Sequence, residues 1–135
     1  MIDCVRRNRG MIRNINDVPM ETIEMEGVKN ASMAVMIGRS DGAPNFALRS
    51  ITVEPGGYTP KHSHDFEHEV YVVEGSGTIL LGEKMHDIKA GDVIYVEADL
   101  EHQFKAQGGE LRFLCMVPAH RSCGEPTPGS EGGVS

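Results

Sequence analysis

The stretch that decides the fold is residues 70–96, whose sequence is VYVVEGSGTILLGEKMHDIKAGDVIYV. It opens with a β-branched and aromatic run at residues 70–73, which a glycine-containing turn then ends. Residues 78–88 hold two further runs on either side of residues 82–84, which is a hairpin signal. Residues 93–96 repeat the strand composition after another glycine turn. Short strands at such even spacing, without a 3.6-residue apolar stripe, predict an all-β antiparallel barrel or sandwich.

Two alternating segments extend this pattern on both sides. Residues 46–53 alternate and place an arginine, an isoleucine and a valine on one face. Residues 111–117 also alternate and place a leucine, a phenylalanine, a cysteine and a valine on one face. We therefore predict a barrel core that spans about residues 33–117.

The length of 135 residues suits one domain with its own core. Residues 1–30 are polar and are predicted to form an N-terminal extension with the first strand or strands, with Met11 as an alternative start. Residues 31–117 are assigned to the barrel. Residues 118–135 hold ten Gly, Pro or Ser among eighteen residues, too few apolar groups to offset ordering entropy. This last segment is predicted to be a flexible tail.

The net charge and the cysteine spacing predict which binding surfaces the protein lacks and which compartment it occupies. The net charge of −7 argues against a nucleic-acid or anionic-membrane surface. Four arginines crowd the first thirteen positions, the last being Arg13, and we interpret them as a solvated tail. No apolar run reaches the length of a signal peptide core or a membrane span. Cys4, Cys115 and Cys123 form no CxxC pair, as is typical of a reducing compartment, so we predict a soluble cytoplasmic protein.

The candidate chemistry lies in residues 56–69, GGYTPKHSHDFEHE, together with one distant histidine. His62 and His64 are two residues apart, a spacing that puts both imidazoles on one face of a strand. As neutral rings they make a chelating pair for a divalent metal ion. His68 follows across a probable turn and is expected to approach from the neighbouring strand. Barrel closure would bring His102 back to the same place.

The spacing of this segment resembles the first motif of the cupins. That motif has a glycine, five residues, His-x-His, three or four residues, a glutamate, six residues and a glycine. Gly56, His62, His64, His68 and Gly75 keep this spacing, with a histidine in place of the glutamate. The resemblance implies a cupin-type antiparallel β-barrel, or jelly roll.

The second cupin motif is kept only in part. Gly91 and His102 stand at the positions of its glycine and histidine, whereas its proline, glycine and asparagine are replaced by Glu97, Asp99 and Ala106. The resemblance covers about residues 44–117.

A closer resemblance is to small single-domain bacterial and archaeal cupins with four metal-binding histidines. It is carried by residues 44–46, 52–57, 62–64, 67–69 and 113–115. It implies a manganese-type site held by His62, His64, His68 and His102. It also implies a homodimer, for which the apolar residues 34–37 are candidate interface residues if they do not pack inside their own barrel.

Glu69 is the alternative third ligand. It satisfies a four-residue gap after His64, but it leaves one residue too few before Gly75. Because a one-residue slip turns every side chain to the opposite face, the register favours His68 and turns Glu69 outward. Glu67 and Glu69 are then either partners for a ring N–H or exposed to solvent.

Four further residues are candidates for the pocket around the metal. Tyr58 and Phe104 are placed at its mouth, with ordinary packing as the alternative. Cys115 is interpreted as a small core residue, although its shared face with Phe113 also places both at the pocket.

The donor set leaves the metal and the activity open. Four neutral nitrogens suit Fe, Zn, Ni, Cu or Co as well as Mn, the ion that the resemblance favours. Two function classes follow: a metal-dependent enzyme acting on a small oxygenated or carboxylated molecule, with oxygenase-like oxidoreductase or Lewis-acid chemistry, and a module that binds or senses a small ligand without turnover. We favour the enzyme, although no acid–base residue is identified from the sequence.

Overall fold

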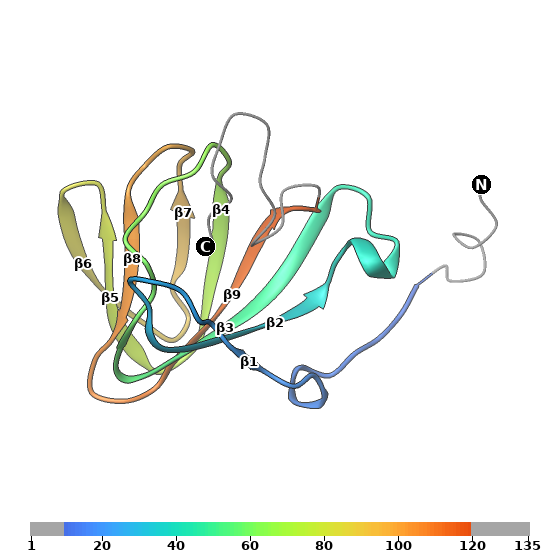
Figure 1. The fold of residues 1–135 in the computed structure, drawn as a ribbon, viewed down its shortest axis with the longest axis horizontal. Coiled ribbons are helices and arrows are strands. Elements are labelled where there is room, and N and C mark those ends of the chain that lie inside the picture. The colour runs from blue at the N-terminus through green and yellow to red at the C-terminus, as the bar shows by residue number, and fades with distance from the viewer. Residues whose placement is uncertain (1–9, 120–135) are drawn as a thin grey trace.

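The computed structural model describes residues 10–119, and the regular secondary structure in this range is almost entirely β-strand (Figure 1). In this range the strands are β1 (Glu21–Thr22), β2 (Lys29–Ile37), β3 (Phe46–Tyr58), β4 (His68–Glu74), β5 (Ser76–Leu81), β6 (Lys84–Lys89), β7 (Val93–Val96), β8 (His102–Ala106) and β9 (Leu111–Pro118). Two single-turn 3-10 helices accompany them, η1 (Ile15–Asp17) and η2 (Arg39–Asp41). Within residues 10–119, no helix is long and apolar enough to cross a membrane.

The strands form one antiparallel sheet that curls into a jelly roll. The strand order is β6-β5-β8-β3-β9-β4-β7, and β2 pairs with β3 while β1 pairs with β2. Figure 1 shows the β5–β6 hairpin at one end of the molecule and the β2–β3 pair at the other. The predicted all-β antiparallel fold is confirmed. The predicted hairpin is also present, because Leu81 pairs with Lys84 around a two-residue turn.

The interior is built from alternating side chains, as strand geometry requires. In β9 the inward-facing residues are at most 2% exposed. They are Leu111, Phe113, Cys115 and Val117, the face that the sequence predicts. The same alternation in β3 turns Arg49, Ile51 and Val53 inward, so the core includes one buried cation.

Several boundaries differ from the prediction. No strand was predicted at residues 102–106, where the structure has β8, because the acidic residues Glu97, Asp99 and Glu101 just before it give no strand signal. The barrel strands run from Lys29 in β2 to Pro118 in β9, and the domain limits of residues 31–117 stay a prediction. Residues 120–135 of the predicted tail, together with Cys4 and Cys123, lie outside the described residues.

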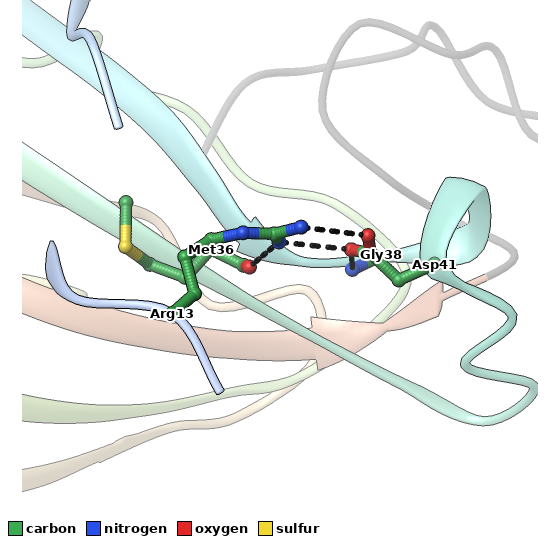
Figure 2. A network of polar contacts seen from close by, with 4 residues as sticks. All are labelled: Arg13, Met36, Gly38 and Asp41. Atoms are coloured by element: carbon green, nitrogen blue, oxygen red, sulfur yellow. Dashed lines mark hydrogen bonds and ion pairs between the residues drawn. The ribbon is translucent and has the colours of Figure 1, made fainter. Parts of the chain in front are cut away.

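Arg13 lies in the exposed N-terminal segment and makes polar contacts with β2 and η2 (Figure 2). Its guanidinium forms two hydrogen bonds with the Asp41 carboxylate, at 3.0 and 3.2 Å, and donates to the Met36 carbonyl. The same carboxylate accepts the Gly38 N–H at 3.0 Å. These donors hold the pKa of Asp41 below its usual value, with the Arg13 hydrogen bond as the largest cause. Arg13 is exposed, as the interpretation of the arginine cluster expects, but it is paired with residues more than twenty positions away in sequence.

Gly75 is the turn residue whose replacement we expect to be most damaging. Its φ is +86°, and a Cβ there would lie 1.8 Å from the Glu110 carbonyl oxygen. Gly91 has a similar φ of +96° but has open space around it, so it provides a matched control. We expect Gly75→Ala to lower the free energy of unfolding by about 2–3 kcal/mol, and Gly91→Ala by about 1 kcal/mol. Urea unfolding monitored by circular dichroism measures both, and equal losses would contradict the steric argument.

Candidate metal centre

The histidines come from two strand starts and the irregular segment between β3 and β4. His68 is the first residue of β4, and His102 is the first of β8. His62 forms an isolated antiparallel bridge with His102, with backbone hydrogen bonds of 3.2 and 2.9 Å. His64 is held by the hydrogen bond from the Asp99 N–H to its carbonyl oxygen, at 2.7 Å.

The prediction that His62 and His64 share a regular strand is wrong. β3 ends at Tyr58, and the chain reaches the two histidines through an irregular segment that begins at Thr59-Pro60.

Three imidazoles nevertheless converge. One ring nitrogen from each of His62, His64 and His102 lies within 4.8 Å of the other two. Their ring centroids are 5.2, 4.9 and 5.1 Å apart, and the rings are steeply inclined to one another. Residues far apart in the sequence are thus brought together by the pairing of residue 62 with residue 102. This histidine triad could hold a metal ion.

His68 adjoins the triad from β4. Its Nε2 lies 2.7 Å from the Nε2 of His64, and its ring centroid is 5.1 Å from that of His102. The His68 side chain is 1% exposed, whereas Glu69 lies on the outer surface. The structure thus orients His68 and Glu69 as the predicted register requires, and the ligand role of His68 stays a prediction.

The outer nitrogens of two rings are fixed by backbone carbonyls. His64 Nδ1 lies 2.9 Å from the Phe66 carbonyl oxygen, and His102 Nδ1 lies 2.9 Å from that of Leu100. A carbonyl oxygen only accepts hydrogen bonds, so in the neutral rings Nδ1 carries the hydrogen and Nε2 keeps its lone pair. Among the described residues, the buried Nε2 atoms of His62 and His102 have no hydrogen-bond partner. Converging lone pairs without donors fit the coordination shell of a cation.

Burial keeps these imidazoles neutral. Desolvation is the largest cause in each case, and it lowers the pKa of His62 to about 3 and that of His64 to about 4. The pKa values of His68 and His102 are lowered as well, again chiefly by burial. Repulsion from neighbouring imidazoles and from the Arg49 guanidinium adds to the shift at His62 and His68. Neutral rings at pH 7 are the form that binds a metal ion.

Of the four predicted pocket residues, two pack in the core, one lies at the end of β3 and one contacts a histidine. Phe104 and Phe113 are buried and stacked on each other, with ring centroids 4.1 Å apart, so they act as packing residues. Tyr58 is half-buried at the end of β3, where it pairs with Lys105 of β8. Cys115 does reach the site, because its sulfur lies 2.8 Å from Nδ1 of His68.

Sequence reasoning missed three contributors to the site. Phe66 stacks on the His64 ring at a centroid distance of 4.0 Å, and Arg49 places its NH2 group 3.6 Å from the Cys115 sulfur. The backbone carbonyls of Phe66 and Leu100 bind the ring N–H groups, whereas the candidate partners Glu67 and Glu69 are exposed. The alternation of residues 46–53 had already placed Arg49 on the same strand face as Ile51 and Val53. Carbonyl partners leave no signal in a sequence.

Known proteins agree with this architecture. The family model described as Cupin domain matches residues 49–117. The 1-methylthio-D-xylulose 5-phosphate methylsulfurylase of Rhodospirillum rubrum is 35% identical over 75 residues, which are 55% of this chain and 48% of that protein. The chain thus spans about half the length of this curated relative.

Solved structures extend the likeness to most of the chain. The polyketide cyclase RemF from Streptomyces resistomycificus has a TM-score of 0.73 and 33% identity, over 81% of this chain and 80% of that one. A predicted oxalate decarboxylase from Thermotoga maritima has a TM-score of 0.72 and 25% identity, over 81% and 99% of the two chains. With its jelly-roll sheet, its histidine cluster and these matches, the chain belongs to the cupin family.

Proposed function

We propose that this protein is a metal-dependent enzyme that binds one divalent transition-metal ion through His62, His64, His68 and His102. The observation that carries the proposal is the convergence of four imidazoles, two of which, His64 and His102, already have their outer nitrogens bound to backbone carbonyls. In this cluster the ring nitrogens that face one another offer lone pairs. The only hydrogen between them is one that a ring shares with its neighbour, as His68 and His64 can. A cation satisfies all of these lone pairs at once.

The charge of the site supports an anionic or oxygen-rich substrate. Four neutral histidines would leave the charge of a bound dication uncompensated, and the buried Arg49 guanidinium adds a further positive charge close to the imidazoles. When bound, the ion supplies Lewis-acid polarisation of a substrate oxygen, or a centre for oxygen chemistry. The apolar residues beside the rings, with Phe66 stacked on His64, exclude water and so strengthen electrostatic contacts with the substrate. We therefore propose a small carboxylated or oxygenated molecule as substrate.

We propose manganese as the native ion, on the four-histidine pattern of the chain. Fe, Zn, Ni, Cu and Co remain competitors, since affinity alone selects poorly among them. Elemental analysis of protein purified without added metal tests this point. About one equivalent of a divalent transition metal per chain is the expected result, and its absence, together with failure to take up Mn(II), would contradict the proposal.

We propose Lewis-acid chemistry ahead of oxidoreductase chemistry as the reaction class. The named activities of the relatives, a cyclase, a predicted decarboxylase and a methylsulfurylase, support an enzyme. The test is incubation of the Mn(II)-loaded protein with a panel of small carboxylates and neutral diols, with and without dioxygen, followed by NMR of the products. Turnover of a carboxylate without oxygen consumption is expected. Binding without any product would favour the second candidate, a ligand-sensing module. That candidate is supported because no acid–base residue is identified among the predicted site residues.

We propose that the protein is a cytoplasmic homodimer. Exposed apolar side chains of β4, β7 and β9 surround a hollow of about 510 Å³ on the outer face of the sheet, among them Tyr71, Val93 and Tyr95. Of the predicted interface residues, Ala34 and Met36 are buried in the barrel, while Val35 and Ile37 are exposed. An exposed apolar patch of this kind supports association with a second copy.

The dimer makes a prediction of its own. Light scattering at micromolar concentration is expected to give twice the chain mass of 14.7 kDa. Val93→Asp, at a position 77% exposed, is expected to shift the mass towards the monomer, since it places a charge in the apolar patch. Met85→Asp on β6, which does not line this hollow, is the control and is expected to leave the dimer intact. A monomer mass for the unchanged protein would contradict the proposal.

A further inference from the structure

Cys115 occupies a position from which it can control one imidazole of the site. It lies on β9 opposite Arg49 of β3, and opposite Val70 of β4 on its other side. His68 is two residues before Val70, so its side chain lies on the same interior face, diagonal to Cys115. The sulfur is 2.8 Å from His68 Nδ1 and 3.6 Å from the Arg49 NH2 group. All three side chains are about 1% exposed, so these contacts are shielded from water.

The partner of the ring Nδ1 at His68 differs in kind from the partners at His64 and His102. His64 and His102 rest on carbonyl oxygens, which permit one tautomer only. His68 rests on a thiol, which can either donate its S–H or accept through a lone pair. A partner of this kind can bind Nδ1 of either neutral tautomer.

That freedom matters because Nε2 of His68 faces a lone pair. In the structure it lies 2.7 Å from Nε2 of His64, whose hydrogen is on the opposite nitrogen. Without a cation, His68 must carry its hydrogen on Nε2 and accept the Cys115 S–H at Nδ1. To serve as a metal ligand it must carry the hydrogen on Nδ1, with the thiol hydrogen rotated away so that the sulfur accepts. The ring and the thiol hold one hydrogen each in both arrangements, so this exchange is balanced.

We propose that Cys115, anchored by Arg49, is the positioning residue for His68, and that its sulfur holds the ring with Nε2 towards the other imidazoles in both tautomers. The inference rests on the proposed metal-binding function of the four histidines. It assigns a role to a buried cysteine that is too enclosed for a surface thiol function. It also accounts for the neighbouring Arg49, whose N–H group holds the sulfur from the strand on the other side.

The test compares two replacements of the same residue. Cys115→Ser keeps both a donor and an acceptor, while Cys115→Val keeps the bulk and removes both. Loss of an outer partner of a metal-binding histidine typically weakens metal binding by about 10–100-fold. We expect that loss for Mn(II) in Cys115→Val, measured by competition with a chromophoric chelator, and recovery to within about threefold in Cys115→Ser. Val117→Ala, on the same face of β9, is the control for core packing and is expected to lower the Tm without changing the affinity.

A second readout uses the metal-free protein. The side-chain nitrogen shifts of His68 in ¹⁵N NMR are expected to show a hydrogen-bonded Nδ1 in the unchanged protein and in Cys115→Ser, and an Nδ1 without a hydrogen bond in Cys115→Val. Unchanged shifts and affinity in Cys115→Val would overturn the inference, as would equal losses in the two variants. If the unchanged protein binds no divalent ion, the proposed function fails, and the nitrogen shifts alone then decide the role of Cys115.

Discussion

His68→Ala is expected to lose its metal ion, while Glu69→Gln keeps it. His68 is buried and its Nε2 lies 2.7 Å from that of His64, whereas Glu69 points to the outer surface from the next position of β4. Losing a direct ligand costs more affinity than losing an outer partner, so the expected loss for His68→Ala is about 100-fold or more. The measurement is metal content per chain after dialysis against a weak chelator.

The two variants are neighbours on one strand, so each controls for the other. Urea unfolding of the metal-free variants separates loss of a ligand from loss of the fold. Full occupancy in His68→Ala with loss in Glu69→Gln would transfer the third ligand position to the carboxylate. Full occupancy in both would leave a three-histidine site made of His62, His64 and His102, and would contradict the four-ligand set.

Acidification is expected to destabilise the metal-free protein over a defined range of pH. In the unfolded chain a histidine takes up a proton near pH 6.5. In the folded protein burial lowers the pKa of His62 to about 3 and that of His64 to about 4. The unfolded state therefore binds more protons between these values, and the free energy of unfolding falls as the pH drops from 6.5 towards 4. Above pH 6.5 the rings are neutral in both states, and this penalty vanishes.

The size of the effect follows from the number of rings. Each imidazole contributes at most about 1.4 kcal/mol per pH unit, and solvent screening reduces this at the less buried rings. For His62 and His64 together the upper bound between pH 6.5 and 4 is about 7 kcal/mol, and after screening we expect a loss of about 3–5 kcal/mol. Urea unfolding at a series of pH values measures it, with His62→Gln expected to flatten the profile. His86→Gln is the control, because His86 is exposed on β6 and away from the cluster. A flat profile for the unchanged protein would contradict buried neutral histidines.

The same shifts in histidine pKa set the pH at which we expect the metal ion to be released. An ordinary imidazole, with a pKa of about 6.5, would lose its metal ion as the pH drops toward 5. In the folded site protons compete for His62 and His64 only near pH 4 or below, so the ion is expected to stay bound at pH 5. Dialysis at pH 7, 5 and 4 followed by elemental analysis tests this, and complete loss at pH 5 would refute it.

Local patterns in the sequence were sufficient for most of the barrel strands and for singling out histidines that the structure brings together in one cluster. The inward face of β9 followed from the two-residue period of residues 111–117, and the β5–β6 hairpin from the glycine turn between two apolar runs. Both are properties of neighbouring residues, which backbone geometry alone dictates. The inward turn of His68 and the outward turn of Glu69 followed from the same period, counted back from Gly75.

Contacts between distant residues could not be predicted in this way. The strand at residues 102–106 was missed, and His62 and His64 were placed on a regular strand although the chain there is irregular. The pairing of residue 62 with residue 102 forms only when the sheet curls, because nothing in either segment specifies its partner.

The sequence by itself determined which imidazoles are candidates for the site, since their spacing and the strand period are local. Only the tertiary structure decided what fixes each ring: a carbonyl for His64 and His102, and a thiol 47 residues away for His68. The physical reason is that the contact between His68 and Cys115 depends on the register of β4 against β9 and on barrel closure, whereas each carbonyl lies two residues from its ring and is aimed by the folded backbone conformation there. Burial, which lowers the histidine pKa values and keeps the rings neutral, is likewise a property of the folded chain alone.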